Sequence, residues 1–152
     1  MDNIPNLLGL ALRAGKLAIG EEPVSARCRA HKAYLLLLAQ DAAENTLRRA
    51  QHYAQSSDNN LCVTIPLSKD DLGRALGRTS CAMAAVGDVG FAAAVADRLA
   101  KADPETYGET SRLLAEKAAR AKKRRAAQRA HEKNIRTGKN KARTAKNTKK
   151  KP

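Results

Sequence analysis

The chain has 152 residues, enough for one compact domain with an appendage. Aromatic residues make up 3% of it and tryptophan is absent, which argues against base stacking on a platform of several aromatic rings. Of the net charge of +14, residues 101–152 carry +13 and residues 1–100 carry +1. Such an asymmetry predicts a polyanionic partner, a nucleic acid rather than a membrane.

Helices and short strands alternate through the first half of the chain. The predicted elements are a helix over 3–15, a strand over 17–19, a helix over 22–30, a strand over 33–39 and a helix that begins at 41. Gly15 ends the first helix. Asp41 and Glu44 form a pair of the capping-box type, which predicts the start of the third helix. Its apolar stripe should contain Ala43, Leu47 and Ala50.

The same alternation continues to residue 100. The predicted elements are a loop over 56–60, a strand over 61–65, a helix over 68–77, a polar loop over 78–80, a strand over 81–86 and a helix over 88–100. Ser68 caps one of these helices and Asp88 caps the other. This alternation predicts an α/β fold, a three-layer α/β/α sandwich around a small mixed sheet of four strands. The pattern leaves the strand order open.

The composition changes after residue 100. Asp103, Pro104 and Gly108 predict a linker over 101–108, so that residues 1–100 form the folded domain.

The remaining residues, 109–152, form a basic C-terminal extension. Residues 109–133 are rich in Ala, Arg, Lys and Glu, which favours a helix. Residues 134–152 have no apolar period and are expected to be disordered. Two cationic clusters, over 122–125 and 149–151, are expected to contact phosphate backbones without reading sequence.

No set of residues points to catalysis, a metal or a cofactor. The three histidines lie far apart, and neither a metal-site spacing nor a Gly-rich phosphate loop is present. The three cysteines are widely spaced, which disfavours disulfides and a zinc site. Asp2 and Arg13 interrupt any signal-peptide pattern, and no stretch reaches transmembrane length. We therefore expect a cytoplasmic protein without membrane contact, cofactor or enzymatic activity.

The stretch over residues 16–26 joins a predicted strand to a predicted helix. Gly20 permits backbone angles that other residues avoid, and Pro23 suits the first helical turn. Glu21 and Glu22 complement the positive end of the helix dipole. On these features alone the stretch is an ordinary strand-to-helix turn.

Four blocks of sequence, in one order and with helix-sized gaps, resemble a known family. They are LALRAGKLAIGEE at 10–22, LLLLAQDAAENT at 35–46, IPLSKDDLGRALG at 65–77 and AAVGDVGF at 84–91. Together they resemble the kink-turn-binding ribosomal proteins of the L7Ae and L30e type, and within them the bacterial YlxQ-like branch. The resemblance covers about residues 3–100. It implies an α/β/α sandwich with an RNA-binding surface in place of an active site.

In that family, a turn with the pattern Gly-x-Asn-Glu-x-x-Lys meets the guanines of a sharply bent RNA. Counting back without gaps from the strand at residue 35, Gly20 falls on the family's glycine, Glu22 on its Asn, Pro23 on its Glu and Ala26 on its Lys. A carboxylate at position 22 can accept from guanine N1–H and N2–H₂ but cannot donate to O6 as Asn does. The turn therefore keeps the family's glycine and changes its side-chain chemistry.

The resemblance and the charge pattern together define the RNA-binding residues that we expect. On the domain they are Lys16, Gly20, Glu21, Glu22, Arg27 and Arg29, together with Arg78, Thr79 and Ser80 in the loop that would meet the bent nucleotides. On the extension they are Lys122, Lys123, Arg124 and Arg125. The expected partner is a ribosomal or another structured RNA, with ribosomal proteins as further partners of a monomeric chain.

Two other functions are compatible with the sequence. Because the turn lacks the family's Asn and Lys, the domain could be a protein-interaction module whose basic extension alone touches RNA. A basic DNA-associated protein is the second alternative.

Overall fold

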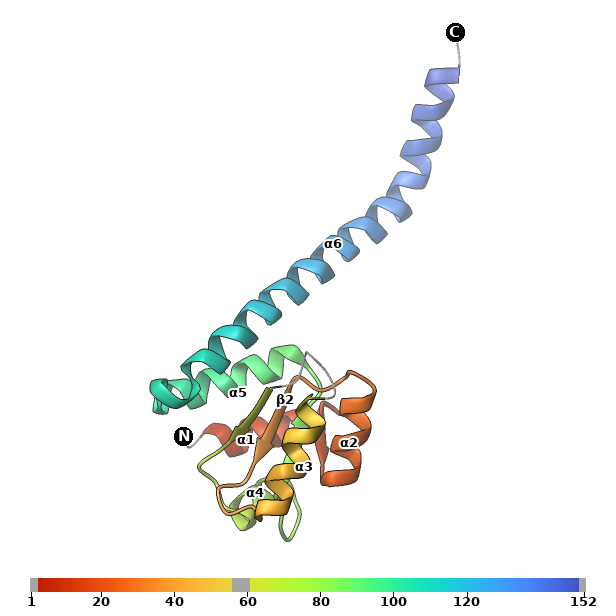
Figure 1. Ribbon diagram of the computed structural model, residues 1–152. Helices are drawn as coiled ribbons and strands as arrows, with labels where there is room; N and C mark the ends of the chain where they lie inside the picture. Colours follow the sequence, from red (N-terminus) through yellow and green to blue (C-terminus); the bar gives the residue numbers. More distant parts are fainter. Residues whose placement is uncertain (1–2, 56–60, 151–152) are drawn as a thin grey trace. The chain divides into compact units, whose positions relative to one another are not determined.

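Figure 1 shows the computed structural model, which describes the backbone of residues 3–55 and 61–150 and the side chains of residues 4–55 and 61–135. The helices are α1 (Asn3–Arg13), α2 (Glu21–Arg29), α3 (Glu44–Gln55), α4 (Lys69–Ala75), α5 (Val89–Ala102) and α6 (Pro104–Lys150). The strands are β1 (Leu17–Ile19), β2 (Leu35–Leu38), β3 (Leu61–Thr64) and β4 (Met83–Val86). The alternation predicted from the sequence is confirmed, and the loop predicted over 56–60 lies outside the described residues.

The four strands form one mixed sheet in the order β1-β4-β2-β3. β4 pairs antiparallel with both β1 and β2, whereas β2 and β3 are parallel. Leu35 and Leu37 of β2 point into one apolar cluster, and Leu36 and Leu38 point into the other. Because helices cover both faces, the continuous apolar run of β2 is fully buried.

Helices cover the sheet as two separate layers. Apolar residues of α1, α4 and α5 pack in the cluster on one face, and those of α2 and α3 pack in the cluster on the other, as Figure 1 shows. The three-layer sandwich predicted from the sequence is therefore confirmed.

The predicted caps of two helices are present. The Ser68 hydroxyl accepts a hydrogen bond from the Asp71 N–H at 3.1 Å, at the start of α4. The Asp88 carboxylate accepts from the Phe91 N–H at 3.0 Å, at the start of α5. Each bond satisfies a backbone donor that has no partner within its helix, as predicted.

The predicted cap of the third helix is wrong. α3 begins at Glu44, and the Asp41 carboxylate accepts from the backbone N–H of Lys69 at 2.7 Å, so it stabilises the start of α4. Ala43 precedes the helix and is exposed, whereas Leu47 is half-buried and Ala50 is buried. Local spacing could not reveal that a long-range backbone donor competes for this carboxylate.

The segment predicted as a linker, residues 101–108, differs in the structure. α5 extends to Ala102 and α6 begins at Pro104, so only Asp103 separates the two helices. The Asp103 carboxylate accepts from both the backbone N–H and the hydroxyl of Thr106, at 3.3 and 2.6 Å. An Asp–Pro pair is also typical of a capping residue followed by a first helical position, and that is its role in this chain.

The chain divides into two compact units, Met1–Lys117 and Ala118–Pro152. In the first unit, Tyr107 and Leu114 of α6 are buried in the cluster that contains α1 and α5. The Tyr107 hydroxyl donates to the backbone carbonyl of Thr64 on the edge strand β3, at 2.6 Å. The first turns of α6 therefore belong to the folded core of this unit.

The second unit consists of the continuation of α6. Its backbone is helical as far as Lys150, where the sequence analysis predicted disorder from residue 134 onward. The physical reason is that Ala, Lys and Arg, which dominate this stretch, all have good intrinsic helix propensity. In the described part of the chain, no helix is long and apolar enough to cross a membrane.

Candidate nucleic-acid interface

The turn over residues 20–22, the Gly20 turn, joins the end of β1 to the start of α2. The Gly20 N–H donates to the Met83 carbonyl at 3.0 Å, and the Gly20 carbonyl accepts from the Val24 N–H at 3.1 Å. Gly20 has φ 89° and ψ 163°, a backbone conformation that favours glycine. The nearest atom to a Cβ at this position would be 4.0 Å away, so the backbone angle and not crowding explains the glycine.

The loop over residues 78–80, the Arg78 loop, lies at the same end of the sheet. It leads into Met83, the residue whose carbonyl is bonded to Gly20. The Arg78 N–H donates to the Gly73 carbonyl at 2.7 Å, and a Cβ at Gly73 would lie 2.8 Å from Ser80 Cα. The loop is thus packed tightly on α4 and needs glycine at position 73.

The Arg78 loop presents its side chains to solvent. Arg78, Thr79 and Ser80 are all exposed, while the following residue, Cys81, is buried. Burial raises the pKa of the Cys81 thiol, and the cationic Arg78 acts in the opposite direction. The structure therefore brings together the two segments that the sequence analysis assigned to RNA contact, at one end of the sheet.

Glu21 makes a contact between helices that the sequence analysis missed. Its carboxylate accepts from the Tyr53 hydroxyl at 2.9 Å and pairs with Arg49 at 2.5 Å, both from α3. The pKa of Tyr53 is raised, chiefly because its proton is donated to Glu21. Nothing in the sequence indicated that α2 and α3 pack together, so these two partners of Glu21 could not be predicted.

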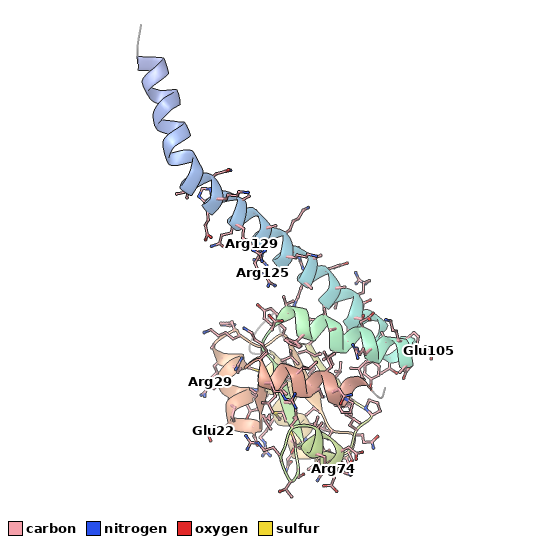
Figure 2. The ribbon with its side chains drawn as sticks, turned by 180° about the vertical axis from the view of Figure 1, so that it is seen from behind. Glu22, Arg29, Arg74, Glu105, Arg125 and Arg129 are labelled. Atoms are coloured by element: carbon pink, nitrogen blue, oxygen red, sulfur yellow. The ribbon has the colours of Figure 1, made fainter. Side chains whose placement is uncertain are left out.

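Glu22 has a different environment from Glu21. It is exposed, and so are Pro23 and Ala26 on the following turn of α2. Figure 2 shows Glu22 and Arg29 toward opposite ends of α2. Glu22 is thus the carboxylate of the Gly20 turn that is exposed to solvent, while Glu21 is held by α3.

Three predicted residues lie away from the Gly20 turn. The Lys16 carbonyl accepts from the Gly87 N–H at 2.7 Å, at the end of β1 where Leu17 pairs with Val86. The Arg27 guanidinium donates to the Gly15 carbonyl at 3.4 Å, and Arg29 lies in the last turn of α2. The structure does not bring Lys16, Arg27 and Arg29 together with the Gly20 turn, because β1 and the length of α2 intervene.

The predicted residues of the extension lie on α6 in the second unit. Lys122, Lys123, Arg124 and Arg125 are exposed, as is every residue whose side chain is described from 122 to 135. Residues 118–152 contain 15 Lys or Arg and one acidic residue, Glu132. Among the described side chains, no three His, Cys, Asp or Glu residues gather in a way that could hold a metal ion.

A groove with a volume of about 430 Å³ lies between α1 and α4. It is lined by Pro5, Asn6, Gly9, Leu10, Arg13, Arg74 and Ala75. Leu10 is 53% exposed, which is high for a large apolar side chain.

Residues 2–96 match the Ribosomal protein L7Ae/L30e/S12e/Gadd45 family, and the chain belongs to that family. Over 90 residues it is 37% identical to the RNA-binding protein YlxQ of Bacillus subtilis (strain 168), a match that covers 57% of this chain and 84% of that protein. It is 50% identical over 46 residues to the RNA-binding protein YlxQ of Enterococcus faecium, covering 30% of this chain and less than half (45%) of that relative. The resemblance stated from the sequence is therefore confirmed.

Solved structures have the same fold. A protein with unknown function from Bacillus halodurans C is similar at a TM-score of 0.56 and 30% identity, over 62% of this chain and 93% of that one. A Giardia lamblia 15.5kD RNA binding protein is similar at a TM-score of 0.51 and 22% identity, over 65% of this chain and 83% of that one. The family match ends at residue 96, so α6 lies outside it.

Proposed function

We propose that the chain is an RNA-binding protein that acts by binding and not by catalysis. The observation that carries this proposal is the hydrogen bond between Gly20 and Met83, which holds the Gly20 turn beside the Arg78 loop. Two relatives are named as RNA-binding proteins. The proposed partner is a sharply bent, structured RNA, ribosomal or associated with translation, in the cytoplasm.

The proposed contacts are Glu22 in the Gly20 turn and Arg78 in the Arg78 loop. The exposed Glu22 carboxylate can accept from the N1–H and N2–H₂ of a guanine whose edge a bend has exposed. Arg78 can donate to a phosphate or to a base edge, and the hydroxyls of Thr79 and Ser80 can donate or accept. Glu21 positions the start of α2 through Arg49 and Tyr53 and need not touch RNA.

The basic part of α6 supplies affinity of a different kind. Its exposed cations release counterions from any nucleic acid that they contact, which strengthens binding without reading sequence. We therefore assign selectivity for bent RNA to the Gly20 end of the sheet and sequence-independent affinity to the residues after Lys117.

Single substitutions in the full chain test the selectivity. Arg78→Ala and Glu22→Ala should each weaken binding to a kink-turn RNA by about 1 kcal/mol, roughly fivefold, and leave binding to a plain duplex unchanged. The measurement is competition between the two RNAs at a salt concentration that screens the basic part of α6. Arg74→Ala is the matched control, because Arg74 is exposed on the neighbouring helix and paired with Asp71. Equal losses for both RNAs in the Arg78 and Arg74 variants would contradict the proposal.

A second candidate function is protein interaction, favoured by the groove between α1 and α4 with its exposed Leu10. This groove suits an apolar side chain flanked by acidic groups, because Arg13 and Arg74 also line it. Full-chain binding of a kink-turn RNA no better than a plain duplex, with no effect of Arg78→Ala, would favour this candidate. Leu10→Ser should then release a bound ribosomal protein without changing RNA affinity.

A further inference from the structure

Four cationic residues come from segments that meet at the end of the sheet opposite the Gly20 turn. Lys16, Arg27, Arg29 and Lys32, the cationic end, come from the start of β1, the last turn of α2 and the residues before β2. Residues 3–20 and 23–40 contain no Asp or Glu. The acidic residues nearest to Lys16 in the sequence are Glu21 and Glu22, and both belong to the Gly20 turn.

Contacts around Gly87 join the segments of the cationic end. The Gly87 N–H donates to the Lys16 carbonyl at 2.7 Å, and the Lys32 N–H donates to the Arg27 carbonyl at 2.9 Å. A Cβ at Gly87 would overlap the Arg27 guanidinium and would lie 3.0 Å from the Lys32 carbonyl. The missing side chain at Gly87 therefore leaves room for the Arg27 guanidinium at this surface.

The carbonyls at the end of α2 already have backbone partners, and among the four cations Arg27 has a backbone acceptor in the Gly15 carbonyl. α2 ends in a Schellman motif, in which Lys32 N–H donates to Arg27 and His31 N–H donates to the Cys28 carbonyl at 3.1 Å. His31 holds the left-handed position of this motif, with φ 57°, where glycine is usual. The last carbonyls of α2 are thus occupied by backbone donors instead of Arg or Lys side chains.

Carboxylates do not neutralise the cationic end either. Asp88, which adjoins Gly87, uses its carboxylate to cap α5. Within the described residues, none of the four cations makes an ion pair, whereas Arg48, Arg74 and Lys101 elsewhere on the first unit are each paired with a carboxylate. Arg29, Lys16 and Lys32 are exposed and Arg27 is half-buried, so their charge is available to an external anion.

We propose that the cationic end is a second RNA contact, which binds the phosphate backbone and is distinct from the Gly20 turn. Lys16 and Gly20 are four positions apart along β1, about 13 Å at ~3.3 Å per residue. A single folded RNA can therefore reach both ends of the sheet. This inference rests on RNA binding by the chain but not on guanine recognition by the Gly20 turn.

Lysine footprinting of the unmodified full chain tests the contact without any substitution. Acetylation of Lys16 and Lys32 should slow at least threefold when a kink-turn RNA with long flanking stems is bound. Lys101, which is exposed and paired with Asp97 at 3.1 Å, is the internal control and should not change. Equal protection of all three lysines, or of none, would overturn the proposal.

A matched pair of triple variants measures how much the cationic end contributes to the salt dependence of RNA affinity. Replacing Lys16, Arg29 and Lys32 with Ala in the full chain should lower the slope of log affinity against log salt by about 2, at ~0.7–0.9 per phosphate contact. Replacing Arg48, Arg74 and Lys101 with Ala removes the same charge and should leave the slope nearly unchanged. Equal slopes for the two triple variants would contradict the proposal. The preference for bent RNA over a plain duplex is a separate readout, because both RNAs can contact the cationic end through their phosphates. If the unmodified chain shows no such preference, that result counts against the Gly20 turn and not against the cationic end.

Discussion

Helix α6 consists of two parts with opposite properties. Residues 104–117 carry three acidic and two basic side chains, and they bury Tyr107 and Leu114 against the sheet layer. Residues 122–135 are exposed throughout, and the chain after Lys117 is almost purely cationic. The folded domain therefore ends where burial ends, not where a composition change or an Asp–Pro pair suggests. Residues 1–117 contain 14 basic and 14 acidic residues, so the whole net charge of +14 lies beyond them.

Two truncations should separate these parts with the largest expected effect. A chain that ends at Asp103 lacks Tyr107 and Leu114 and should lose on the order of 5 kcal/mol of unfolding free energy, since each fills buried volume. A chain that ends at Lys117 should keep the unfolding midpoint of the full chain in urea. Equal stability of the two truncated chains would show that the first turns of α6 are not part of the core.

Leu114→Ala tests the same boundary with one side chain. Leu114 is fully buried, so the substitution should lower the unfolding free energy by about 2–4 kcal/mol. Its neighbour Leu113 is half-buried, and Leu113→Ala should cost less than about half as much. Urea unfolding of both variants decides the point. Similar losses of unfolding free energy in the two variants would mean that Leu114 is not buried more deeply than Leu113.

Tyr107→Phe removes a single hydrogen bond and should have a smaller effect. The substitution leaves the carbonyl of Thr64 on the edge strand without its 2.6 Å donor and should cost about 1 kcal/mol. The substitution should lower the midpoint of thermal unfolding by the same amount in residues 1–117 alone and in the full chain. A shift in only one of the two would contradict the assignment of Tyr107 to the first unit.

The smallest expected effect is a loss of stability at high pH. Burial raises the pKa of Cys62 to about 11, so above its ordinary value of 9.0 the unfolded chain loses the thiol proton first. Stability should therefore fall as the pH rises from about 9 toward 11, and Tyr53 and Tyr107, with raised pKa values, act in the same direction. Urea midpoints measured at pH ~8 and ~10 should differ less in Cys62→Ala than in the unmodified chain. An equal difference would exclude Cys62 as a cause.

Most of the fold could be predicted because its signals are local. Apolar periodicity gave α1 and β2 correctly, and Ser68 and Asp88 act as the predicted caps. The errors concern long-range partners. The Asp41 carboxylate bonds to Lys69, which is 28 residues away, and Tyr107 bonds to Thr64, which is 43 residues away. Spacing along the chain does not contain that information.

The candidate site was predictable only in part. Local pattern showed Gly20 between a strand and a helix and Arg78 in a polar loop, but the resemblance to the family is what assigned both residues to RNA contact. That the two segments meet follows from the antiparallel pairing of β1 with β4, which sequence could not provide. The same pairing moves Lys16 to the opposite end of the sheet and so divides one predicted surface into two.

The salt dependence of selectivity tests the central claim most directly. The affinities of the full chain and of residues 1–117 for a kink-turn RNA and for a plain duplex should be measured over a range of salt concentrations. We predict that removing residues 118–152 lowers the salt slope by roughly 5 or more and preserves, or increases, the ratio of the two affinities. An unchanged slope, or a ratio that falls to one when these residues are removed, would contradict the division of roles between the Gly20 end and the basic part of α6.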